Sequence, residues 1–360
     1  MIQQNSEYYN LEDFLNSNLS CHKILYIDLS GNKIGVEGIK DLCLGIQSCI
    51  NLSNLTLFLQ QNNTGDEGTS QLASALTNCP FLSTLVISLG SNQIGDEGSK
   101  DLGLSLSKCS NLQNLTLFLQ YNNIQAQGAQ GLAQILANSK NLQFLKFQLQ
   151  YNNFGDDGAF NFGSIFIDSS KIQTLSLDLK HNSIGASGAS GLISALSNCK
   201  NLSNLIISLM YNNIGTQGAS GLGLALSNCT NLQNLTISLG YNKIGPQGAI
   251  DFGNSLAKSS KLTTLMLHFQ HNKIKDEGAL GLGFSLSRFA NLKMLVLNLS
   301  ENNIGSQGIS DLGQGLKQCN NLQILALYLQ QNYNKIKGEQ NLIKKVQKIK
   351  RLVRKQINTF

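Results

Sequence analysis

Aromatic rings recur at a constant spacing in this sequence. One position of a repeating pattern holds in turn Tyr121, Tyr151, His181, Tyr211, Tyr241 and His271. Tyrosine combines a large contact area with a polar tip and is enriched at protein interfaces. The column therefore predicts either a partner-binding surface or a structural stack of rings that shields neighbouring polar groups, and the sequence leaves both open.

A second column of candidate contact residues lies in segments where apolar residues alternate with variable ones. Alternate side chains of a strand point to opposite faces, so the variable residues should point away from the core. We expect a face without net charge here. With the first column, the candidate partner-binding residues are Phe58, Phe118, Tyr121, Tyr151, His181, Tyr211, Tyr241, His268, His271 and Tyr328.

Catalytic and metal-binding patterns are missing from the sequence. No phosphate-binding loop, zinc-protease, nucleophile-elbow or kinase signature occurs, and the four histidines show no ligand spacing. No C-x-x-C pair is present, and six of the eight cysteines share one repeat position: Cys49, Cys79, Cys109, Cys199, Cys229 and Cys319. We predict a non-enzyme without cofactor or metal, with buried, reduced thiols.

The composition favours a globular protein of the cytoplasm. Hydrophobic residues make up 41% of the 360 residues, but only 13% are charged, against about 25% in a typical domain. No apolar stretch is long enough to span a membrane, and the segment Met1–Leu25 does not resemble a signal peptide. Reduced cysteines also fit the cytosol.

The elements that would position these residues form a tandem repeat with a period of about 30 residues, within the range typical of solenoid proteins. Each unit reads as a short strand, a turn at Asn, and a helix that starts near Gly-Ala, and such units must stack into a solenoid to bury their apolar faces. We expect the asparagines to form a structural ladder, and Asp66, Asp96 and Asp276 to cap their own helices. The ladder consists of Asn62, Asn92, Asn122, Asn152, Asn182, Asn212, Asn242, Asn272 and Asn302.

The repeat resembles a known family. The run from Asn231 to Gly245, NLQNLTISLGYNKIG, followed by Gly248-Ala249, looks like the leucine-rich repeat of the ribonuclease-inhibitor type. The resemblance extends from about Ile24 to about Val346. It implies an α/β horseshoe, with a concave parallel β-sheet and convex helices, and a concave face that holds another protein.

The two ends of the chain differ from the repeats between them. We expect residues 1–22 to form an N-terminal capping helix and residues 23–338 to form about ten to eleven repeats. Residues 339–360 are expected to form a basic, amphipathic C-terminal capping helix. From Lys335 to Phe360 there are nine basic residues and one glutamate. This end is expected to cap the solenoid or to dock on an acidic protein, a membrane surface or nucleic acid.

The function expected from these features is protein binding without catalysis, through the concave face and the strand-to-helix loops. The alternative is a regulator of an enzyme, either a GTPase activator of the Ran type or a nuclease inhibitor. The partner is a protein of unknown identity. The body of the chain lacks the basic grooves of nucleic-acid binders, and membrane contact is expected at most through the basic C-terminal segment.

Overall fold

The computed structural model describes residues 5–137, 140–164, 166, 171–333 and 336–358. The chain divides into two compact units, residues 1–182 and residues 183–360. We call them unit 1 and unit 2.

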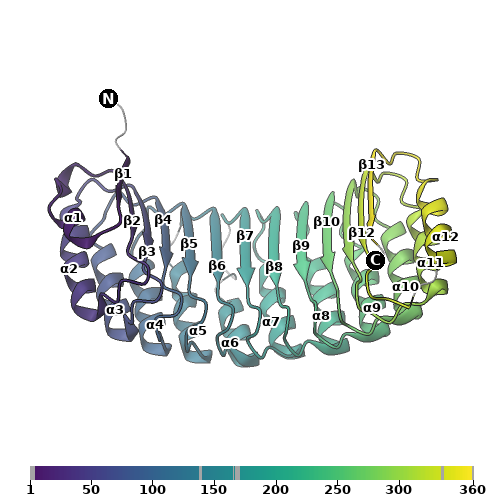
Figure 1. Cartoon of the computed structure of the whole chain (residues 1–360), viewed down its shortest axis with the longest axis horizontal. Helices are drawn as coiled ribbons and strands as arrows, with labels where there is room; N and C mark the ends of the chain where they lie inside the picture. The colour runs from purple at the N-terminus through teal and green to yellow at the C-terminus, as the bar shows by residue number, and fades with distance from the viewer. Residues whose placement is uncertain (1–4, 138–139, 165, 167–170, 334–335, 359–360) are drawn as a thin grey trace. The chain divides into compact units, whose positions relative to one another are not determined.

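Unit 1 is a parallel sheet covered on one side by helices (Figure 1). Its strands lie in sequence order, each paired with the next. The elements are β1 (Asn5–Tyr8), α1 (Leu11–Leu15), a 3-10 turn (Leu19–Cys21), β2 (Ile24–Asp28), α2 (Gly35–Ser48), β3 (Asn54–Phe58), α3 (Gly65–Leu76), β4 (Thr84–Ser88), α4 (Asp96–Leu106), β5 (Asn114–Phe118), α5 (Ala126–Ala133), a second 3-10 turn (Gln134–Leu136), β6 (Phe144–Gln148), α6 (Gly155–Ser164) and β7 (Thr174–Asp178).

Unit 2 has the same two-layer construction, again with parallel strands in sequence order. The predicted α/β solenoid is therefore confirmed. The elements are α7 (Ala186–Leu196), β8 (Asn204–Ser208), α8 (Gly215–Ser227), β9 (Asn234–Ser238), α9 (Gly245–Leu256), β10 (Thr264–His268), α10 (Lys275–Ser287), β11 (Met294–Asn298), α11 (Ser306–Leu316), β12 (Ile324–Tyr328), α12 (Ile336–Val346) and β13 (Arg354–Asn358).

The core lies between the sheet and the helices of each unit. In β10, Leu265 and Leu267 are at most 1% exposed, and Leu282 of α10 is fully buried on the helix side. The other strand residues point to the opposite side of the sheet, which we call the strand face. Full burial of a leucine contributes roughly 2 kcal/mol, so the inward positions, filled in nearly every repeat by Leu, Ile or Phe, hold each unit together.

Glycines inside the helices mark close approaches between neighbouring helices. A side chain at Gly103 of α4 would meet the backbone of Gly131 in α5, and one at Gly223 of α8 would meet the backbone of Phe252 in α9. The glycines thus allow consecutive helices to pack closely, which explains why residues with a poor helix propensity recur there.

Both ends of the chain differ from the sequence-based expectation. The predicted helix over residues 339–360 is wrong: α12 ends at Val346, and the chain adds the further strand β13 beside β12. At the N-terminus, only Leu11–Leu15 form an α-helix, and β1 precedes it and pairs with β2. In both places an added strand satisfies backbone groups that would otherwise be unpaired at a sheet edge.

The acidic residues of the loops cap the following helix instead of their own. The Asp66 carboxylate accepts a hydrogen bond from the N–H of Gly95, 2.6 Å away, at the start of α4. Asp96 accepts from Gln125 and Gly128 at 2.8 Å, at the start of α5. Because α3, α4 and α10 receive no cap from their own side chains, these aspartates link adjacent repeats, and the prediction of capping within one repeat is wrong.

Candidate functional site

Buried asparagines hold the turn that follows each strand. The Asn122 amide donates to Leu89 O and Leu119 O, both at 3.0 Å, and its oxygen accepts from the N–H groups of Asn92 and Ile94, also at 3.0 Å. In unit 2 the Asn272 amide donates to Leu239 O and Phe269 O, and its oxygen accepts from the N–H groups of Asn242 and Ile244. Each asparagine thus joins its own turn to the preceding repeat. All nine ladder asparagines, Asn62, Asn92, Asn122, Asn152, Asn182, Asn212, Asn242, Asn272 and Asn302, are at most 8% exposed.

The aromatic column sits immediately before this ladder, in a backbone conformation that the sequence does not reveal. Its residues have φ between 53° and 59°, the left-handed region that favours glycine. Such a conformation costs roughly 1 to 2 kcal/mol in a residue with a side chain. The Tyr121 N–H donates to Gln150 O and the Tyr241 N–H to Gln270 O, both at 3.0 Å, and these bonds to the next repeat hold the strained residues in place.

In unit 1, three rings of the column form a continuous stack. The ring centroids of Tyr121 and Tyr151 are 4.4 Å apart with an interplanar angle of 11°. Tyr151 and His181 are also 4.4 Å apart, at 18°. The Lys180 ammonium lies 5.9 Å from the Tyr151 ring, and burial, followed by the charge of Lys180, lowers the pKa of His181.

Unit 2 contains a stack with the same order of residues, Tyr-Tyr-His, but a different charged residue lies beside it. Tyr211 and Tyr241 stack at 4.1 Å, and Tyr241 and His271 at 4.4 Å. A hydrogen bond between the tyrosine side chains raises the pKa of Tyr241. His271 Nδ1 lies 3.4 Å from the Glu301 carboxylate, so this stack ends at an acid, whereas the unit 1 stack carries a lysine.

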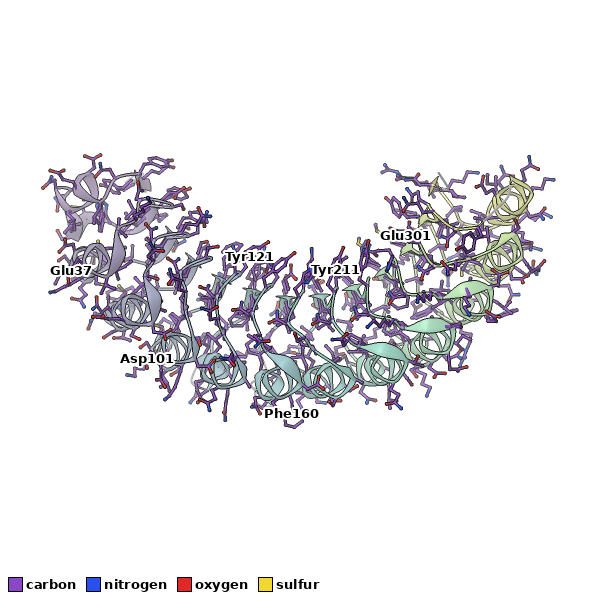
Figure 2. The ribbon with its side chains drawn as sticks, turned by 60° about the horizontal axis from the view of Figure 1, so that its bottom comes forward. Glu37, Asp101, Tyr121, Phe160, Tyr211 and Glu301 are labelled. Carbon is purple, nitrogen blue, oxygen red and sulfur yellow. The ribbon has the colours of Figure 1, made fainter. Side chains whose placement is uncertain are left out.

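The stacked rings remain accessible to solvent at their edges, as Tyr121 illustrates. Tyr121 is 54% exposed, and Figure 2 shows it on the strand side of unit 1, opposite Phe160 on the helix side. Each stack, together with its turn, forms what we call the loop edge of its unit. The stacking agrees with the structural alternative, in which the rings support one another.

The other candidate residues lie on the strand face and do not gather into one cluster. In unit 1, Phe58 packs against Tyr26 at 5.6 Å, and Phe118 lies 5.3 Å from the Lys146 ammonium. In unit 2, His268 and Tyr328 lie on β10 and β12, separated by Asn298 of β11. Burial lowers the pKa of His268.

Two groups of surface residues were not predicted from the sequence. Tyr9, 63% exposed, packs on Tyr26 of β2 at the N-terminal end of unit 1. In unit 2, outward positions of β10 to β12 hold Met266, Val296 and Ile324. The strand residues of both groups lie earlier in their strands than the Phe58 column, at outward positions outside the two columns of predicted contact residues.

The expectation of an uncharged strand face holds for only part of the molecule. The strands of unit 1 carry Glu7, Asp28 and Asp178 as well as Lys146. Asp28 and Asp178 belong to the Phe58 column itself, so the expectation is wrong for that column in unit 1. In unit 2, the charged strand residues are in β13, which contributes an arginine and a lysine.

The thiol groups of the chain are mostly buried. None of the eight cysteines, all of which the structure describes, forms a disulfide, and Cys21 is the exposed one among them. Burial raises the pKa of the Cys229 thiol to about 11 and that of Cys319 to about 12. Within the residues that the structure describes, no group of three or more His, Cys, Asp or Glu side chains is placed to hold a metal ion, and no helix is long and apolar enough to cross a membrane.

A comparison with protein-family models agrees with the repeat pattern. A family model described as "Leucine Rich repeat" matches residues 20–43, 79–103, 173–192, 261–283 and 290–313. Among solved structures, a leucine-rich repeat protein of Leptospira interrogans is similar, with 17% sequence identity and a TM-score of 0.40, over 98% of this chain and 99% of that one. No curated protein matches the sequence significantly.

Proposed function

Because this chain is a leucine-rich repeat protein, we propose that it is a non-catalytic scaffold that binds a protein partner through its strand face and loop edges. The observation that carries the proposal is the contrast between inward and outward strand positions. In β10, β11 and β12, the inward residues are Leu in every case, whereas the outward ones vary between Met, Val, Ala, Thr, Ile, His, Asn and Tyr. Packing restricts the inward side chains, and the outward ones are free to match a partner.

The framework supports binding because it is rigid where the contact residues sit. The turn carrying Tyr241 is fixed by the buried Asn242 amide, which donates to Leu209 O, Leu239 O and Gly240 O. Contact side chains on such a frame lose little entropy on binding. We also assign the protein to the cytoplasm, and its eight cysteines, which form no disulfide, support a reducing compartment.

Affinity capture followed by calorimetry tests the scaffold function. The intact chain is used as bait, and each captured protein is purified and titrated into wild type and two variants. Tyr151→Ser combined with Tyr241→Ser alters both loop edges, whereas Phe160→Ser alters a ring of α6 that is 60% exposed on the helix side. We expect the tyrosine variant to weaken binding at least tenfold and Phe160→Ser to leave it unchanged.

The opposite result would place the binding surface on the helices. A partner that is a GTPase and hydrolyses GTP faster in the presence of the chain would instead identify an enzyme regulator. Circular dichroism melts of each variant control for loss of folding.

A further inference from the structure

The strands of unit 2 lack the acidic residues that the strands of unit 1 contain. No Asp or Glu occurs in β8 to β13, whereas β1, β2 and β7 of unit 1 carry Glu7, Asp28 and Asp178. A carboxylate brought to the strand face of unit 2 would therefore meet no like charge from the strands themselves.

Apolar side chains adjoin one another on this face. Met266 of β10 aligns with Val296 of β11, which aligns with Ala326 of β12, and Met294 aligns with Ile324. All are partly exposed, Ile324 by 37%. We call Met266, Met294, Val296, Ile324, Ala326 and Tyr328 the apolar patch. The two spacings of about 4.8 Å between three strands and the four steps of about 3.3 Å between five residues give a patch of roughly 10 by 13 Å. This is enough for two turns of a helix or a short extended segment.

Basic residues border the patch. Arg354 of β13 aligns with Ile324, and Lys293 directly precedes Met294. Both are exposed, and neither takes part in a salt bridge among the described residues. Of the eight basic residues in 336–358, Arg354 and Lys355 lie in β13, the strand that pairs with β12. The strands β10 to β13 contribute no carboxylate that would neutralise Arg354 and Lys293.

We propose that the apolar patch and its basic border bind an acidic amphipathic segment of a partner protein, an inference that rests on the proposed scaffold function. Apolar side chains of the segment contact the patch, where the flexible Met266 and Met294 adapt to their shape. Carboxylates of the segment face Lys293 and Arg354, which accelerate association and set the orientation of the segment.

Other anionic partners fit the surface less well. Membrane binding requires apolar side chains that penetrate about 5 to 10 Å into the lipid interface, but those of the patch are partly buried on the flat face of a sheet. Single-stranded nucleic acid binds through stacked aromatic side chains in a basic groove, and Tyr328 is the patch's one aromatic residue.

A peptide library gives an unbiased test. Random peptides long enough to form several helical turns are displayed on phage and selected on the intact chain, and the enriched peptides are synthesised and measured by fluorescence anisotropy. We expect the enriched sequences to combine Asp and Glu with apolar residues at helical or alternating spacing. Enrichment of basic or wholly polar peptides, or no enrichment, would overturn the proposal.

Two pairs of variants locate the binding. Val296 and Val86 occupy the same outward strand position in unit 2 and unit 1 and are both partly exposed. We expect Val296→Asp to lower the affinity for the enriched peptide at least tenfold. Val86→Asp should lower it less than twofold. Arg354→Glu should weaken binding about fivefold, whereas Lys317→Glu, at an exposed position after α11, should have no effect.

Competition experiments separate the remaining occupants. Vesicles that contain phosphatidylserine, a short single-stranded RNA and the unlabelled chain itself are each added to the peptide complex. Displacement of the peptide by vesicles, RNA or the chain, at concentrations similar to that of the free peptide, would contradict the proposed acidic segment. The ligand of the patch would then be a membrane, a nucleic acid or a second copy of the chain, respectively. A captured partner could bind the Tyr151→Ser, Tyr241→Ser variant more weakly than wild type but bind Val296→Asp as tightly as wild type. In that case the scaffold function stands and the patch proposal is wrong.

Discussion

Units 1 and 2 share one framework and present different surfaces. Asn122 and Asn272 make equivalent hydrogen bonds, and each unit carries a Tyr-Tyr-His stack. The strands of unit 1 mix acids, a lysine and aromatic rings, whereas those of unit 2 combine an apolar patch with a basic final strand. The repeat therefore fixes the inward side chains and the turns but leaves the strand face free to diverge.

The strongest destabilisation is expected where adjacent helices pack. A Cβ added at Gly103 in unit 1 would lie 2.0 Å from Gly131 O, whereas one added at Gly283 in unit 2 would lie 3.0 Å from Leu312 Cα. We expect Gly103→Ala to lower the free energy of unfolding by about 3 kcal/mol. Gly283→Ala should change it by less than about 1 kcal/mol, because better helix propensity offsets the tighter contact. Urea unfolding measures both, and equal losses would contradict the difference in helix spacing.

The next effect tests whether the two ladders are equivalent. Asn122→Ala and Asn272→Ala each leave buried N–H and C=O groups without a partner, which costs about 2 to 3 kcal/mol. Hydrogen exchange measured by mass spectrometry should show faster exchange around each substituted turn, to a similar extent in both units. The exposed Asn320→Ala serves as control. An unchanged exchange pattern for either ladder variant would rule out a stabilising role in that unit.

A smaller effect is expected at the caps between repeats. Asp96→Ala removes the acceptor for two N–H groups at the start of α5, and Asp276→Ala removes the acceptor for the Gly305 N–H. We expect losses of about 1 kcal/mol for Asp96→Ala and somewhat less for Asp276→Ala. Thermal melts compare them with Glu97→Ala, whose side chain is exposed. If Glu97→Ala were equally destabilising, general charge at the loops would matter instead of the cap.

The weakest effect is a dependence of stability on pH. Burial lowers the pKa of His181 in unit 1 and of His268 in unit 2. As pH falls below the ordinary histidine pKa of about 6.5, these histidines therefore bind protons in the unfolded chain before they do so in the folded chain. The free energy of unfolding should decrease as pH falls below that value. His268→Gln should reduce this dependence, as followed by urea unfolding at pH 7 and pH 5. An unaltered pH profile in the variant would show that His268 contributes nothing to it.

The sequence predicted the repeat, the solenoid and the positions of the buried residues, because these follow from a period that packing enforces. It did not predict β13, since lysine and arginine occupy strand positions that are uncharged in most other repeats. It also missed the left-handed φ of the aromatic column, whose N–H groups donate hydrogen bonds to carbonyls of the next repeat. The direction of capping was wrong for the same reason, since Asp66 and Asp96 act on the helix of the following repeat.

The sequence offered a structural stack of rings as one of two alternatives for the Tyr and His column. The Tyr and His column identified the residues that the structure brings into two stacks. The apolar patch was missed because Met266, Val296 and Ile324 belong to outward columns that hold mostly polar residues in unit 1. A surface that arises in only one unit leaves no periodic signal.

NMR of methionine methyl groups gives the sharpest test of whether the apolar patch of unit 2 is a binding surface. The chain contains four methionines, and Met266 and Met294 lie in the patch, whereas Met210 lies near Gln270 at the loop edge. The methyl groups are labelled with 13C, assigned by Met→Leu variants and titrated with an enriched acidic peptide. We predict that the Met266 and Met294 signals shift to saturation and that the Met210 signal moves less. Binding that is detected by calorimetry but leaves Met266 and Met294 unchanged would contradict the assignment of this surface.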